Sequence, residues 1–153
     1  MHSPFTAAPG RTAALALALL VAAGCESSPL ETDDDHPEVN GLTIVRDGQI
    51  LARATGAAQP QGQISVPVGD SLGVAVVVFD FDGETVLLAA DEFVEIQVAE
   101  ESVATFAPSS PRAGSGTFHG HAVGQTSFVI RLRHGDPAHT DFLSPAIPLV
   151  VTP

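Results

Sequence analysis

The stretch TSFVIRLR, residues 126–133, alternates apolar and polar positions with a period of two. Phe128, Ile130 and Leu132 fall on one side of this alternation. The positions between them, which we expect to face outward, are Ser127, Val129, Arg131 and Arg133. Because side chains of a strand point alternately to its two faces, the stretch predicts a strand with one face in a hydrophobic core.

The same period recurs from residue 41 to the C-terminus. Asp47-Gly48 predicts a two-residue hairpin turn between strands at 41–46 and 49–55, because both residues tolerate a positive φ. Pro67 places a strand at 64–68 on a sheet edge, whereas Leu72–Asp80, apolar on both faces, is expected at a sheet centre. Further strands are expected at 93–98, 102–106, 116–122 and 146–152. With no amphipathic helical period, these strands predict a β-sandwich, with a closed barrel as the alternative.

Four segments carry a resemblance to a known family: ISVPVGD at 64–70, DFDG at 80–83, ESVATF at 101–106 and GTFHGHAVGQT at 116–126. Their order resembles that of bacterial immunoglobulin-like domains of the group 2, invasin and intimin type. The resemblance covers the chain from Ile64 onward and implies an all-β, immunoglobulin-like Greek-key β-sandwich, with a role in adhesion, spacing or display. Together with the strands expected before it, we predict that this domain spans residues 41–153. A tryptophan frequent in that family is absent, and Ile96 falls near its place.

The N-terminus has the pattern of a secretory signal. Arg11 precedes an uncharged apolar run at 12–23, which is too short to span a bilayer. The run ends in VAAGC at 21–25, which resembles the lipobox of bacterial lipoproteins. We therefore predict a lipoprotein signal peptide at 1–24 and lipidation of Cys25, the alternative being an ordinary signal peptide with an unmodified cysteine.

Residues 25–40 are acidic and polar and have neither helical nor strand periodicity, which predicts a flexible tether. Acyl chains on Cys25 would anchor this tether in a membrane without spanning it. The expected location is the bacterial cell envelope, on the inner or outer membrane, facing the periplasm or the cell surface.

Composition excludes several classes of function. The formal net charge is -12 and all six basic residues are arginine, which excludes a nucleic-acid partner. A single cysteine excludes a disulfide framework. Since no nucleophile-elbow or phosphate-loop motif occurs, we predict no catalytic residue and no enzyme activity. The expected function is a membrane-tethered interaction or structural module with a protein or other envelope partner.

The alternative function is binding of zinc or copper, because imidazole and carboxylate groups suit both ions. The candidate ligands are His119, His121, His134, His139 and Asp141, with Asp136 nearby. The competing interpretation is that these histidines are exposed surface residues. No other cofactor is predicted.

Two further charged groups have a functional and a structural interpretation. Asp80, Asp82 and Glu84 carry oxygen ligands that suit calcium, although an Asp-Gly turn already accounts for them. Arg131 and Arg133, two residues apart on an outward face, suit either surface ion pairs or a partner's carboxylate.

Overall fold

Eleven strands and no helix make up the part of the chain that the computed structural model describes, residues 38–110, 114–135 and 139–153. The all-β prediction is therefore confirmed. The predicted signal peptide, Cys25 and most of the predicted tether lie outside these residues. Within them, no helix is long and apolar enough to cross a membrane.

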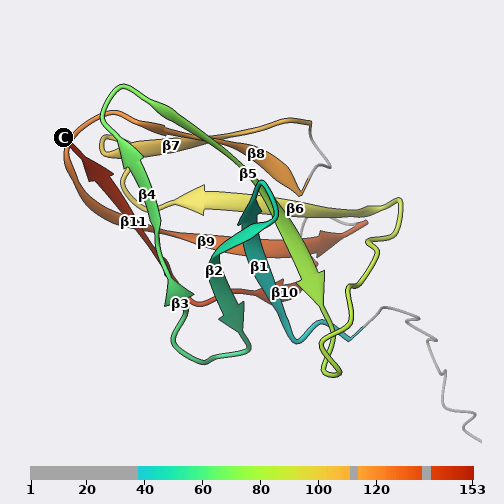
Figure 1. Ribbon diagram of the computed structural model, residues 1–153. Helices are drawn as coiled ribbons and strands as arrows, with labels where there is room; N and C mark the ends of the chain where they lie inside the picture. The colour runs from blue at the N-terminus through green and yellow to red at the C-terminus, as the bar shows by residue number, and fades with distance from the viewer. Residues whose placement is uncertain (1–37, 111–113, 136–138) are drawn as a thin grey trace, which may run out of the picture. The chain divides into compact units, whose positions relative to one another are not determined.

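Six antiparallel strands form the first sheet, in the order β3-β2-β1-β5-β8-β7 (Figure 1). Their bounds are β1 Gly41–Arg46, β2 Gln49–Thr55, β3 Gln61–Gly62, β5 Ser71–Phe79, β7 Ala104–Pro108 and β8 Ser115–Gly120. β5 lies between β1 and β8, which confirms the central position predicted for it. Asp47 and Gly48 have φ angles of 51° and 78°, as a two-residue turn that follows the sheet twist requires, so the predicted hairpin is confirmed.

The second sheet is built around β9, Gly124–His134. β6, Glu92–Val98, pairs with residues 128–134 along one edge of β9. Two strands share the other edge of β9. β10, Thr140–Leu143, pairs with residues 131–133. β11, Ile147–Thr152, pairs with residues 124–128. β4, Ile64–Pro67, pairs in parallel with β11 and forms the outer strand, as its proline predicts.

The strand order is that of an immunoglobulin-like sandwich. β1-β5-β8-β7 corresponds to the A-B-E-D sheet of this fold, and β6-β9-β10/β11 corresponds to the C-F-G sheet. The chain changes sheet on either side of β4, on either side of β6, and between β8 and β9. The structure is therefore the predicted Greek-key sandwich and not the closed barrel, and β2 and β3 extend its first sheet.

A contact between two phenylalanines joins the sheets. The rings of Phe118 in β8 and Phe128 in β9 have centroids 4.8 Å apart, and the two residues are 0% and 1% exposed. Phe106 of β7 continues the stack, with its centroid 4.9 Å from that of Phe118. Ile130 and Leu132 are also buried, which confirms the core face predicted for 126–133.

Two strand boundaries differ from the prediction. At each of them, one carbonyl group accepts two consecutive backbone N–H groups and so ends the regular pairing of the strand. The strand predicted at 102–106 begins at Ala104, since the Glu100 carbonyl accepts the N–H groups of Val103 and Ala104 in a turn. The strand predicted at 116–122 ends at Gly120, since the Val103 carbonyl accepts the next two N–H groups, at 2.8 and 3.2 Å. His121 therefore lies outside β8.

Ser144 bridges the break between β10 and β11. Its backbone N–H donates to the Ile130 carbonyl and its Oγ accepts the Ile130 N–H, both at 2.9 Å. The hydroxyl donates in turn to the Pro145 carbonyl at 2.9 Å. The side chain thus replaces a backbone partner that the interrupted strand cannot supply.

We expect Ser144→Ala to destabilise the domain by about 1–3 kcal/mol, because it leaves the buried Ile130 N–H without an acceptor. Urea unfolding followed by circular dichroism measures the loss. Ser65→Ala, at an exposed position of β4, is the matched control and should change stability by less than about 0.5 kcal/mol. Equal stability of the two variants would contradict the bridging role of Ser144.

Gly120 allows β4 and β11 to approach β8. A Cβ atom at this position would lie 2.7 Å from the Pro67 carbonyl oxygen and 3.0 Å from Val151 Cγ1. Backbone atoms cannot yield at such distances without moving a strand. A Cβ atom added at Gly73, on β5, would have no atom within 4 Å beyond its own residue and chain neighbours.

Gly120→Ala should therefore destabilise the protein by about 1–3 kcal/mol, through overpacking. Gly73→Ala should be neutral or slightly stabilising, since its new methyl group meets no atom. Thermal melts of the two variants test this, with a fall of several degrees expected for Gly120→Ala alone. A larger fall for Gly73→Ala than for Gly120→Ala would contradict the close approach of β4 and β11 to β8 at Gly120.

Candidate functional site

Two of the predicted metal ligands lie beside β7 and β8. His119 is on the outer face of β8, where its Nδ1 is 2.8 Å from Oγ of Ser71. His121 follows β8, and its Nε2 is 2.8 Å from Oγ1 of Thr105. Thr105 is the register partner of His119 in β7, so both imidazoles lie on the same side of the sheet, as predicted. Each of the two imidazoles is therefore hydrogen-bonded to a hydroxyl group and not to the other imidazole.

The other two histidines lie at the β9–β10 connection. His134 Nε2 is 2.7 Å from Oδ2 of Asp91, and His139 Nε2 is 2.7 Å from Oδ1 of Asp141. The two rings meet edge to face with centroids 6.3 Å apart. Each imidazole in this pair is therefore next to a carboxylate.

The length of β9 separates the two pairs. His121 precedes the first residue of β9 by a short turn and His134 is its last residue, and eleven residues extend about 33 Å. Nitrogens that bind one zinc ion at about 2 Å each must lie within about 4 Å of one another. The four histidines and Asp141 therefore do not form a single metal site in this fold. In the described parts of the chain, no three His, Cys, Asp or Glu side chains are grouped so as to hold a metal ion.

Among the described residues, His134 and His139 are the pair of imidazoles that lie next to each other and beside carboxylates, but they do not form a metal site as they stand. If zinc gives a heat in calorimetry, we therefore expect a His134→Ala/His139→Ala variant to lose it. The His119→Ala/His121→Ala variant should keep the wild-type heat. Loss of the heat in this second variant would contradict the separation of the pairs.

The other charged groups have local partners. Asp80 Oδ1 accepts the N–H groups of Asp82 and Glu84, both at 2.9 Å, so this carboxylate holds the turn after β5. Arg133 pairs with Glu95 at 2.8 Å, and Arg131 donates to the Gln97 side chain at 2.7 Å. The structural interpretation of the turn and of the surface arginines therefore agrees with the contacts.

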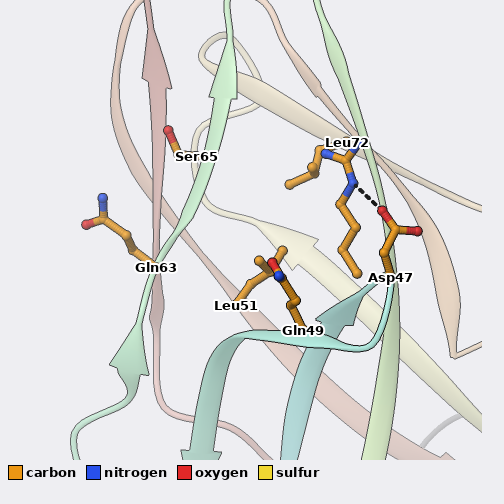
Figure 2. A pocket seen from close by; sticks show the side chains of 7 residues that line it. Asp47, Gln49, Leu51, Gln63, Ser65 and Leu72 are labelled. Atoms are coloured by element: carbon orange, nitrogen blue, oxygen red, sulfur yellow. Dashed lines mark ion pairs between the residues drawn. The ribbon is translucent and has the colours of Figure 1, made fainter.

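The sequence did not reveal a groove at the tip of the β1–β2 hairpin. Figure 2 shows Gln49 and Leu51 on the β2 wall and Gln63 and Ser65 on the opposite wall. The groove has a volume of about 520 Å³. The residues that line it are Arg46, Asp47, Gln49, Leu51, Gln63, Ser65 and Leu72.

A β-bulge in β2 lines this groove. The register passes from Ile44–Ala52 to Val45–Ile50, which leaves Leu51 as an extra residue. Ile50 would otherwise follow Ala52 on the core side, but it is 62% exposed, and Leu51 packs against the core instead. Bulges redirect side chains in this way. The sequence signal is the pair of consecutive apolar residues, Ile50-Leu51, in an otherwise alternating strand.

The groove has the chemistry of a binding site. Leu51 and Leu72 give the lining its apolar part, and its polar part consists of two carboxamides, a hydroxyl and the Arg46–Asp47 ion pair, at 3.4 Å. Donors and acceptors together with apolar side chains, in a volume within the range of about 300–1,000 Å³ of ligand pockets, suit an uncharged polar ligand or side chain.

No protein-family model matches the chain, and no curated protein matches it. Among solved structures, it is similar to domains 4 and 5 of the S-layer protein SbsC, with a TM-score of 0.49 and 16% identity over 77% of this chain and 48% of that one. A structure of SbsC domains 4–9 gives a TM-score of 0.48 and 16% identity, over 76% of this chain and 14% of that one. The chain thus spans less than half of either structure.

Proposed function

We propose that this protein is a lipid-anchored, non-enzymatic module of the bacterial cell envelope, with a domain of the group 2, invasin and intimin type. It binds a protein or other envelope partner and holds that partner near a membrane. The immunoglobulin-like sandwich described above is a scaffold that supports this role, although a fold alone does not fix a function.

The proposed tether joins the domain at a defined point. The Asn40 N–H donates to the Phe79 carbonyl at 3.0 Å, and the Asn40 carbonyl accepts the Gly56 N–H at 2.8 Å. These two bonds hold the chain to the first sheet directly before β1. Acylation of Cys25 would therefore fix the domain to a membrane through the polar segment that ends here.

The position of the hairpin groove is the observation that carries the proposal. β1 begins next to Asn40 and ends at the groove, so its six residues place the groove about 20 Å from the point of attachment. A partly polar groove at the end remote from the tether stays accessible to a partner when the N-terminus is anchored.

The contact between Ser71 and His119 supports a non-enzymatic role. A serine next to a histidine is part of many hydrolytic sites, in which a third group orients the histidine. Here both residues are register partners on the outer face of the first sheet, and their contact is exposed. It is a surface contact between neighbouring strands and is open to water.

Mass spectrometry of the protein extracted from membranes tests the anchor. We expect the mature N-terminus to be Cys25 with acyl chains attached, and Cys25→Ser to move the protein to the soluble fraction. Ser27→Ala leaves the cysteine in place and is the matched control, with an unchanged distribution. A mature protein with an unmodified thiol at Cys25 would refute the anchor.

A further inference from the structure

We propose that the free edge of β6 and the groove between β6 and β7 bind an extended peptide strand of a partner, rich in apolar and basic residues. The partner strand adds to the second sheet in antiparallel orientation. This proposal deepens the proposed function, since it names the surface and the chemistry of the partner, but its test does not depend on the lipid anchor.

Among the edges of the two sheets, β6 has the longest stretch without a blocking feature. β3 has two residues and β10 has four, β7 ends in Pro108, and β4 ends in Pro67. Proline and short length are common means by which proteins protect sheet edges. β6 has seven residues without proline or glycine, and its register with β9 is uninterrupted from end to end.

The backbone of β6 offers unpaired groups along this edge. The Ala99 N–H, directly after β6, donates to the Ser127 carbonyl of β9 at 2.8 Å. Because an antiparallel ladder has a period of two, the odd-numbered residues of β6 point their N–H groups toward β9. The N–H and C=O groups of Val94, Ile96 and Val98 therefore point away from it. Within the described residues, β9 is the strand to which β6 is paired.

Two adjoining hollows follow the same edge. One, of about 170 Å³, is lined by Phe93, Val94, Glu95, Ile96, Phe106 and Pro108. The other, of about 270 Å³, is lined by Glu95, Ile96, Gln97, Val98, Glu101, Thr105 and Phe106. Each is smaller than the roughly 300 Å³ at which pockets for drug-sized ligands begin. Consecutive hollows of this size suit the alternate side chains of a strand, which is how added strands gain specificity.

The pairing geometry defines which partner residues enter these hollows. In an antiparallel ladder, residues opposite Val94 and Ile96 would exchange both backbone hydrogen bonds with them and place their side chains on the same face. That face is the interior of the sandwich, because Val94 is 7% exposed and Ile96 packs against the core. The partner residues at these positions must therefore be apolar.

Charge favours a basic partner over a second copy of this chain. Glu95 and Glu101 line the hollows; Glu95 is paired with Arg133 at 2.8 Å, whereas Glu101 is exposed and supplies the charge preference. A chain of net charge -12 repels its own copies. The partner positions that alternate with the apolar ones are accordingly expected to be lysine or arginine.

A capped seven-residue peptide that alternates valine with lysine is the probe. It is titrated into ¹⁵N-labelled protein from residue 25 onward with Cys25→Ser, which contains all the described strands. We expect the largest amide shifts at Val94, Ile96 and Val98. Shifts centred on Gln49 and Leu51, or no binding at millimolar peptide, would overturn the proposal.

Two methylated peptides separate strand addition from simple charge attraction. N-methylation of the valines removes the donors that face β6 and should weaken binding about tenfold. N-methylation of the lysines alters amides that face away, and should leave the affinity near that of the parent peptide. Equal affinities for the two methylated peptides would refute the proposed hydrogen bonding.

The charge preference has its own control. Glu101→Lys should weaken binding of the valine–lysine peptide about threefold, since an exposed charge pair contributes little. A valine–glutamate peptide that binds the unsubstituted protein as tightly as the lysine peptide would contradict the basic partner. Shifts at β6 that depend on protein concentration and not on peptide would identify a second copy of the chain as the occupant.

Discussion

The contact between Phe118 and Phe128 is the constraint on which the sandwich depends. Through it, β8 of the first sheet contacts β9 of the second sheet inside the core, and both rings are almost fully buried. In a chain without tryptophan, these two rings are the largest fully buried side chains of the described core. The glycines at 116 and 120 follow from this arrangement, because β8 presents Phe118 inward between two positions that have no room for a side chain.

Much of this fold could be predicted because its signals are local. Alternation located β6 and β9, the apolar run at 72–80 located β5, and the turn chemistry of Asp47-Gly48 located β1 and β2 as the first hairpin. The missed features depend on contacts between distant residues. β10 is held through Ser144, fourteen residues from its partner Ile130, and the parallel pairing of β4 with β11 has no local sequence signature.

The candidate sites show the same limit. A spacing of two residues correctly placed His119 and His121 on one side of a sheet, but sequence proximity to His134 said nothing about the length of the intervening strand. The hairpin groove was missed because a bulge reverses the alternation on which the strand prediction was based. The β6 edge was not visible from the sequence, since openness of an edge depends on which strands the fold places beside it.

The position of β1 has a mechanical consequence. β1 is hydrogen-bonded on both sides, to β2 and to β5, over most of its length. A pull on Asn40 directed along β1 loads both ladders in shear, so that their hydrogen bonds share the force and do not open one after another. The domain would thus resist stretching at the strand where such a force enters.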